Sequence, residues 1–455
     1  MSVLNKTFQT LQKTFQNEEL RKRILFTLMI FVIYRIGSFI TVPGVNSGVL
    51  YAALEDTTML GFMDALTGGA LQQFSIFAMS ISPYITASIV IQLLQMDVVP
   101  TLAEWAKEGE TGKRKLNQLT RYMSLILAFI QAIAMAIGFN FWVGGALLQT
   151  QQVWIYFYIG IVMTAGTAIL LFFADQITKK GIGNGTSMII VAGIMSRMPE
   201  MVRDIYRRYV GGGEMAGQEF LSIGELDGTG VAFNIIGLIG IVALIVITII
   251  LVIYLQSATR RLPIQYANRH SSAQLTGRKD SFIPFKLNSA GVIPVIFASS
   301  ILSLPIMIVR FLPEDTTASI WLDRIFNFQE QPIGLLLYIV FIFGFTFFYA
   351  FVQVSPEKIA ENLKKQGSYI PGIRPGDDTE NHVSKILGRV TFIGAIYLVC
   401  IAALPLALGF VPGLHIPPSV QIGGTGILIV VGVALETAKQ IANRNQEKEY
   451  RGFIK

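Results

Sequence analysis

The sequence predicts an all-α membrane protein whose helices cross a lipid bilayer ten times. Of its 455 residues, 52% are hydrophobic and only 14% are charged. Charged residues make up about a quarter of ordinary soluble domains, so lipid is the expected solvent for much of this chain. A helix that crosses the hydrocarbon core needs about 20 mostly apolar residues. The runs that approach or meet this length are 24–42, 76–96, 122–142, 153–173, 186–202, 231–256, 287–309, 332–354, 390–411 and 423–440.

The lysines and arginines predict how these spans are oriented. With the N-terminus inside, 29 of the 36 basic residues fall in inside segments and Arg35 lies within a span. The six counted as outside are Arg197, Arg203, Arg207, Arg208, Arg310 and Arg324. Basic residues accumulate on the cytoplasmic side of membrane proteins, so both termini are expected to be cytosolic. The outside loop around 203–230 is the weak point of this assignment, because it carries several arginines of its own.

Ten spans divide the chain evenly. The expected parts are a cytosolic N-terminal segment (1–23), an N-terminal half (24–202), a periplasmic hinge loop (203–230), a C-terminal half (231–440) and a cytosolic tail (441–455). Five spans in each half make any structural repeat an inverted one, as is common in transport proteins. The functional path then lies where the halves meet.

A short apolar segment between the first two spans has two interpretations. It runs from Leu60 to Leu71, holds Asp64, Gly68 and Gly69, and is too short to cross the membrane. One interpretation is a re-entrant half-helix, which membranes tolerate only where protein or a water-filled cavity receives it. The other is an amphipathic helix on the outer surface. The residues alone leave both open.

Signals of enzyme chemistry are nearly absent, so no catalytic site, cofactor or metal is predicted. Cys400 is the only cysteine, and the three histidines have no metal-ligand spacing. The stretch 181–185 (GIGNG) is expected to be a tight turn between two spans rather than a phosphate cradle. Arg35 lies within the first predicted span. One arginine alone makes no proton relay, so it is expected to pair or to reach toward the interface.

Two functions of multi-span proteins, coupled transport of small solutes and intramembrane catalysis, find little support in the residues. A secondary transporter of small solutes normally needs several ionisable groups converging at the midplane, which the spans do not offer. An intramembrane enzyme, such as a lipid or sugar transferase, needs paired carboxylates or histidines near the inner face. The nearest such cluster is Asp377, Asp378, Glu380 and His382, which a solvated acidic turn explains more simply.

Two other patterns favour a channel. Ile81 and Ile85 flank Pro83 at the start of a span, and bulky aliphatic side chains at a constriction can exclude water and ions. Isoleucine in a membrane helix more often faces lipid or core, so this pattern needs other support. The inside loops 257–286 and 355–389 are long and basic, and the prolines and glycines around Arg374 predict a turn that presents it outward. We expect these arginines to dock an acidic protein surface or RNA, rather than only to orient the chain in the membrane.

The chain resembles the bacterial SecY family over nearly its whole length. Several stretches carry the resemblance in the family's order: 35–39 (RIGSF), 75–94 (SIFAMSISPYITASIVIQLL), 100–104 with 107–122, 176–185, 288–300 (NSAGVIPVIFASS), 361–376 (ENLKKQGSYIPGIRPG) and 423–425 (GGT). The resemblance implies an hourglass channel that conducts unfolded secretory polypeptides and releases membrane helices sideways into the bilayer.

The resemblance also implies roles for particular residues. The segment around 60–71 becomes the plug, with Leu60, Asp64, Gly68, Gly69 and Leu71. The pore ring maps onto Ile81, Ile85, Thr186, Ile190, Ile296 and Ile429; the lateral gate onto Ser88, Gln92 and Asn288; and the docking site onto Arg260, Arg261, Arg269 and Arg374. Thr186 departs from the family's all-aliphatic ring, so the ion seal is expected to depend more on the plug.

The partners and location follow from the same resemblance. The implied partners are the small membrane subunits SecE and SecG, the SecA motor ATPase, the ribosome, signal peptides and unfolded preproteins, and the lipid bilayer, with SecDF and YidC also suggested. The implied location is the bacterial inner (cell) membrane.

Overall fold

Each of the ten predicted spans coincides with one helix of the protein. The computed structural model describes residues 17–50, 64, 66–96, 98–211, 213–215, 218–220, 228–266, 281–309, 316–410 and 418–452. The ten helices are α2 (Glu18–Ser38), α5 (Ser82–Leu94), α7 (Glu110–Trp142), α8 (Val153–Lys180), α9 (Gly185–Tyr206), α10 (Gly228–Ser257), α11 (Ile293–Val309), α13 (Pro332–Gln353), α15 (Asp377–Gly409) and α16 (Pro418–Gly452). Within the described residues, six of them are long and apolar enough to cross a membrane, and α5 and α11 are shorter apolar helices.

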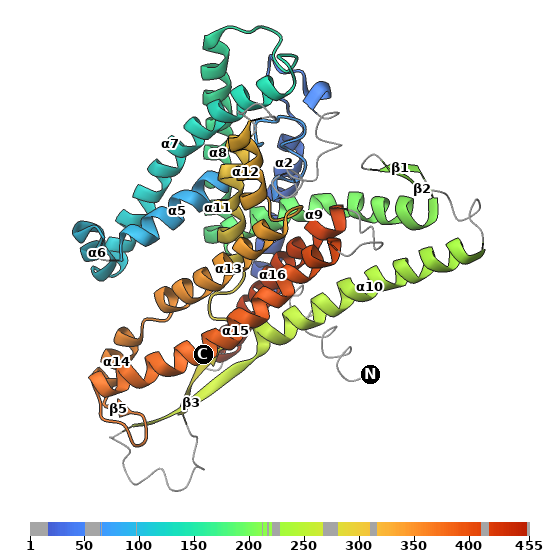
Figure 1. The fold of residues 1–455 in the computed structure, drawn as a ribbon. Coiled ribbons are helices and arrows are strands. Elements are labelled where there is room, and N and C mark those ends of the chain that lie inside the picture. The colour runs from blue at the N-terminus through green and yellow to red at the C-terminus, as the bar shows by residue number, and fades with distance from the viewer. Residues whose placement is uncertain are drawn as a thin grey trace.

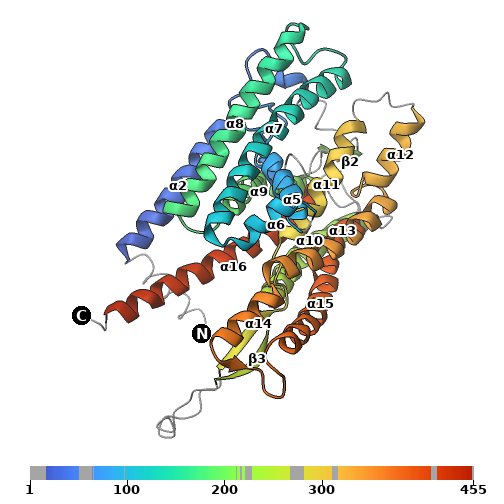
Figure 2. The same cartoon turned by 90° about the vertical axis from the view of Figure 1, so that its left-hand side faces the viewer.

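The helices form two groups that meet in the middle of the molecule. In Figure 2 the blue-to-teal helices α2, α7 and α8 lie to one side of the orange helices α13 and α15, with α5, α9 and α11 between them. Across this junction α5 packs on α11, and α9 packs on α16. The long helix α10 lies along the edge of the molecule in Figure 1, beside α15 and α16. The junction of the two groups is therefore where a path between them would run.

Two predicted spans begin later than the sequence indicated. The span 76–96 is helical only from Ser82, and the span 287–309 only from Ile293. Pro83 lies in the first turn of α5, where its missing N–H leaves no hydrogen bond unmade. Before α11, Gly291 has a φ of +66°, which interrupts a helix. Apolar composition thus predicted burial at these places, and turn-forming residues set where the helices begin.

The predicted turn at 181–185 is confirmed. Helix α8 ends at Lys180 and α9 begins at Gly185. Gly183 has a φ of +83°, and the side chain of Asn184 caps α9 by accepting a hydrogen bond from the Thr186 N–H at 3.2 Å. These residues build a tight turn that carries no phosphate-binding strand before it.

The long basic loops contain a small sheet that the sequence analysis did not predict. Strand β3 (Thr259–Tyr266) pairs antiparallel with β4 (Ser281–Lys286) and with β5 (Ser368–Tyr369). Leu262 and Phe285 of the sheet pack against Leu363 of α14 (Pro356–Lys365) and Val383 of α15 in one buried cluster. The two loops therefore form one folded lobe rather than two separate loops.

The outside loop predicted around 203–230 also contains regular structure that the sequence analysis did not predict. Helix α9 runs past residue 202 to Tyr206, and a π-helical turn, η1 (Arg207–Gly211), follows it. Strands β1 (Gly213–Met215) and β2 (Gln218–Phe220) then pair as a short hairpin.

Two further short helices connect the predicted spans. They are α6 (Pro100–Lys107), which precedes α7, and α12 (Thr317–Phe326), which precedes α13.

Two helical glycines are expected to differ in how they tolerate substitution by alanine. A Cβ at Gly166 of α8 would lie 1.9 Å from the carbonyl oxygen of Ile76, so Gly166→Ala forces two backbones apart and is expected to cost about 1–3 kcal/mol. The matched control is Gly388→Ala in α15, where nothing lies within 4 Å; it is expected to be neutral or to stabilise by up to about 1 kcal/mol. Thermal unfolding of both purified variants in the same detergent tests the packing, and equal melting temperatures would contradict it.

Candidate functional site

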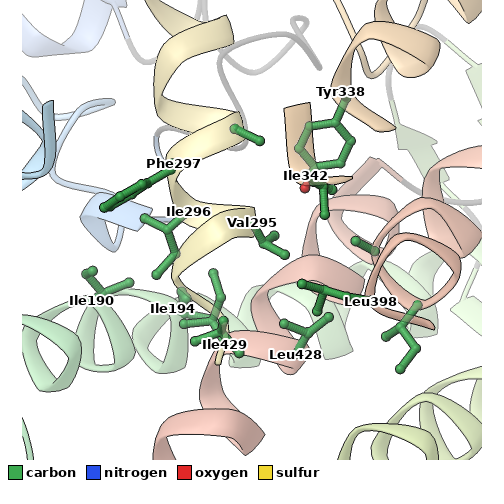
Figure 3. Packing of buried hydrophobic residues seen from close by; sticks show 14 of the residues in the cluster. Ile190, Ile194, Val295, Ile296, Phe297, Tyr338, Ile342, Leu398, Leu428 and Ile429 are labelled. Carbon is green, nitrogen blue, oxygen red and sulfur yellow. The ribbon is translucent and has the colours of Figure 1, made fainter. Parts of the chain in front are cut away.

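A buried apolar cluster occupies the junction of the two groups of helices. Ile190 of α9, Ile296 of α11 and Ile429 of α16 converge there from three elements (Figure 3). Their relative exposures are 6%, 5% and 0%, and Ile85 of α5 joins the same cluster at 8%. Four of the six predicted ring residues are thus brought together, and all four are aliphatic.

A small cavity lies beside this cluster, and Ile81 is one of the residues that line it. It is fully buried and packs in a neighbouring cluster with Tyr34 of α2. Ile81, Ile85 and Ile190 line a cavity of about 30 Å³, which Leu66 and Thr67 border from the segment before α5. The predicted ring and the predicted plug are therefore neighbours in the fold.

Thr186 is less buried than the other predicted ring residues. It is half-buried in the first turn of α9, one helical turn before Ile190, whereas the five isoleucines of the predicted ring are buried. Its hydroxyl donates a hydrogen bond to Asn184 Oδ1 at 2.8 Å. The hydroxyl therefore already has a partner within its own turn.

The predicted plug segment is held inside the protein. Asp64, Leu66 and Thr67 are helical, and Leu60 lies outside the described residues. Asp64 is 1% exposed, and Leu71 is fully buried. Tyr34 Oη of α2 donates a hydrogen bond to the Thr67 carbonyl at 2.7 Å. A helix lying on the outer surface would expose one face, so this burial favours the re-entrant alternative.

Small residues let this segment approach α9 closely. A Cβ on Gly68 would lie 2.4 Å from Ser196 Oγ, and one on Gly193 would lie 2.3 Å from the carbonyl of Leu66. Gly68 and Gly69 also have positive φ values of +69° and +86°, which favour glycine. Both glycines that the sequence analysis singled out are therefore required by local geometry.

Arg35 of α2 also contacts the predicted plug segment. Its Nη1 donates a hydrogen bond to the Gly68 carbonyl at 2.6 Å, and its guanidinium lies 4.5 Å from the centre of the Phe39 ring. A lone arginine in a span was expected to pair or to reach toward the interface. The structure gives it a carbonyl partner in the protein interior instead.

The sequence analysis missed one charged contact. Arg197 of α9 forms ion pairs with Asp64 and with Glu200, and its Nη1 also donates a hydrogen bond to Gln72 Oε1 at 3.3 Å. Arg197 had been counted only as an outside charge. Asp64 and Arg197 are too far apart in sequence for any helical spacing to indicate their contact.

The predicted gate residues hydrogen-bond locally through their amide nitrogens, while Gln92 Oε1 and Asn288 Oδ1 are buried without a hydrogen-bond partner among the described residues. Gln92 Nε2 donates to Ser88 Oγ at 3.0 Å along α5. Asn288 Nδ2 donates to the Gly291 carbonyl at 2.8 Å just before α11. The hydrogen bonds found therefore link Ser88 to Gln92 and leave Asn288 in a separate local interaction.

The predicted docking arginines lie on the folded lobe. Arg260 and Arg261 are exposed on β3, and Arg261 lies 4.7 Å from the centre of the Phe282 ring. Arg374 is exposed in a turn, and its carbonyl accepts a hydrogen bond from Thr379 Oγ1 at 2.7 Å. Arg269 lies outside the described residues. The turn before α15 presents Arg374 to solvent, as its prolines and glycines predicted.

The acidic cluster near Arg374 has a structural explanation. Asp377, Asp378 and Glu380 form the first turn of α15, where negative charge complements the helix dipole. Across the described ranges, no group of three or more histidine, cysteine or acidic side chains could hold a metal ion. The cluster therefore gives no support to an intramembrane enzyme.

Comparison with known proteins identifies the family. The family model described as SecY matches residues 75–438. The chain belongs to the SecY family. A relative from Halalkalibacterium halodurans named "Protein translocase subunit SecY" is 46% identical over 448 residues, which cover 98% of this chain and all of that protein.

Solved structures with the same fold are more distant in sequence. One, described as "The plug domain of the SecY protein stablizes the closed state of the translocation channel and maintains a membrane seal", has a TM-score of 0.60 at 18% identity and covers 93% of this chain and 92% of that chain. Another, described as "Cryo-EM structure of idle yeast Ssh1 complex bound to the yeast 80S ribosome", has a TM-score of 0.61 at 16% identity and covers 92% of this chain and 89% of that chain. The predicted fold class, an all-α multi-pass membrane protein, is confirmed: the fold is mostly helical, and the strands of its described part form two small sheets outside the predicted spans.

Thr186→Ile is expected to lower the ion leak of this SecY-family chain at rest. The substitution removes a hydroxyl one turn from Ile190 and extends the aliphatic surface of α9, and apolar constrictions exclude ions by dewetting. Single-channel conductance of the reconstituted chain is the measurement, with Ser187→Ala in the same turn as control. A leak equal to that of the unsubstituted protein would show that Thr186 is no part of the seal.

Proposed function

We propose that this chain is the pore-forming subunit of a protein-translocation channel, which conducts unfolded secretory polypeptides and releases membrane helices sideways into the bilayer. The observation that carries the proposal is the aliphatic cluster of Ile85, Ile190, Ile296 and Ile429 where the two groups of helices meet. Membership of the SecY family and relatives named as translocase subunits support it.

The chemistry of this cluster suits a passing polypeptide. Aliphatic side chains exclude water and ions when they close on one another. They present no hydrogen-bonding group, so a threaded chain of any sequence meets no polar site that would hold it. Conduction through such a constriction is passive, which requires energy from a partner and no catalytic residue in this chain.

The rival transporter function lacks its required groups. A coupled carrier needs several ionisable side chains converging within the membrane. Among the described residues, Asp64 is the only buried carboxylate, and it is already paired with Arg197. A channel that moves polymers needs no such relay.

The contacts between helices and the exposed arginines support a gate, docking partners and a membrane orientation. Helices α5 and α11 pack directly across the junction, which suits them to part for a membrane helix. Exposed Arg260, Arg261 and Arg374 on the lobe suit a ribosome or the SecA motor, and the yeast structure was solved on a ribosome. In Figure 2 the start of α2 and the end of α16 lie toward the same side as β3, which supports cytosolic termini on the side of the lobe. A bacterial inner membrane, with SecE and SecG as partners, belongs to the same proposal and is supported by membership of the SecY family.

Crosslinking tests whether the aliphatic cluster is the pore. Single cysteines replace each of Ile81, Ile85, Thr186, Ile190, Ile296 and Ile429 in a Cys400→Ser background, because Cys400 is an exposed native thiol. A stalled secretory substrate with one cysteine is expected to crosslink at these positions. The matched controls are Ile161→Cys and Ile236→Cys, whose side chains are 61% and 68% exposed on the outer surface. Equal crosslinking at ring and control positions would place the substrate elsewhere.

Arg374→Glu tests the docking role of the lobe. The charge reversal is expected to abolish transport of secretory preproteins while the protein remains inserted, because an exposed arginine on a rigid turn suits a phosphate or carboxylate partner. Lys385→Glu, an exposed basic residue on neighbouring α15, is the matched control and is expected to transport normally. Transport by both variants at the unsubstituted rate would exclude Arg374 from docking.

A further inference from the structure

Asp64 is the most deeply buried charge in the described part of the chain. It is 1% exposed and lies on the segment that borders the cavity beneath Ile81. Its Oδ1 accepts a hydrogen bond from the Gln72 N–H at 3.0 Å, and its other oxygen pairs with Arg197. An ionised carboxylate is stable at this depth only while such partners remain.

The partner of Asp64 belongs to a different element. Arg197 is on α9, which also carries Ile190 of the aliphatic cluster. The side chain of Arg197 is 19% exposed, whereas its second partner, Glu200, is 39% exposed. Arg197 therefore links the plug segment to α9, and its second ion pair is with a carboxylate that is more exposed to solvent.

Moving the plug segment away from α9 has to break this ion pair. The hydrogen bonds from Tyr34 and Arg35 to the carbonyls of Thr67 and Gly68 break as well, but those carbonyls are neutral and lose less when separated. A buried ion pair gains little over apolar packing, yet separating its members leaves an uncompensated charge, which is strongly unfavourable. The pair thus resists displacement more than it stabilises the fold.

We propose that the Asp64–Arg197 ion pair is a latch on the plug segment, and that its strength sets how apolar a signal segment must be to open the channel. The proposal rests on the proposed channel function. A ligand shifts a two-state equilibrium only by its difference in affinity for the two states. A stronger latch therefore demands a signal segment that binds the open state more favourably.

The geometry predicts unequal effects for the two single substitutions. Arg197→Gln leaves Asp64 buried without a cationic partner, held by neutral backbone N–H groups such as that of Gln72, whereas Asp64→Asn leaves Arg197 with Glu200. Arg197→Gln is therefore expected to open the plug more than Asp64→Asn. The double variant Asp64→Asn/Arg197→Gln buries no unpaired charge and is expected to open less than Arg197→Gln alone. Glu200→Gln is the matched control, because it removes a carboxylate from the same arginine without touching the plug segment.

The experiment uses the full chain reconstituted in planar bilayers and in vesicles. Resting ion conductance without substrate reports the open fraction, which is expected to rise about tenfold or more in Arg197→Gln and to stay unchanged in Glu200→Gln. Transport of one preprotein with a series of signal segments of decreasing leucine content reports the threshold. Arg197→Gln is expected to accept less apolar segments than the unsubstituted chain.

Two results would overturn the latch. One is conductance of Arg197→Gln equal to that of Glu200→Gln; the other is a double variant whose conductance equals the product of the two single effects, since coupled residues are not additive. Should Arg197→Gln fail to accumulate, Asp64→Asn, which is nearly isosteric, must still exceed Glu200→Gln. If the unsubstituted chain transports no preprotein, the channel function fails, and the conductance comparison still decides the latch separately.

Discussion

A stretch of non-helical backbone in the protein interior determines the arrangement of the whole site. From Gly68 to Ile81 the chain runs in turns. The core of a bilayer holds no water that could hydrogen-bond the peptide groups of such a stretch. The protein satisfies them internally: the Ile76 N–H donates to the Ile40 carbonyl and the Val42 N–H to the Phe74 carbonyl, both at 3.0 Å. Phe74 and Ser80 adopt positive φ values of 45° and 48°, which persist only where the surroundings over-determine them.

This constraint joins the features on which the proposed function depends. The stretch places the plug segment at one of its ends and Ile81, with α5 after it, at the other. Helices α2 and α8 fix it in between, because Phe77 fills the space beside Gly37 and the Ile76 carbonyl lies against Gly166. The proposed plug, the proposed ring residue Ile81 and the proposed gate helix α5 are therefore positioned by one continuous stretch of backbone, and a shift of that stretch would move all three together.

The sequence predicted the membrane helices well, because hydropathy over about 20 residues measures burial in lipid directly. It predicted the turn at 181–185 and the outward-facing Arg374 from glycines and prolines whose geometry is local. It failed where structure depends on distant partners. The sheet of β3, β4 and β5 joins residues more than 100 positions apart, and α5 begins at Ser82 although the apolar run begins earlier, since apolar composition does not distinguish a buried turn from a helix.

The charges show the same limit most sharply. Counting lysines and arginines by loop treats each as a signal of orientation, and so Arg197 was assigned to the outside and Asp64 to an interruption of an apolar segment. Both assignments are compatible with the sequence, because 133 positions separate the residues and no helical period connects them. Only the fold brings the two charges together, with the carboxylate 1% exposed. A charge buried at that depth must be paired or it would be expelled, so a lone acid in an apolar membrane segment is itself a reason to look for a basic partner on a neighbouring span.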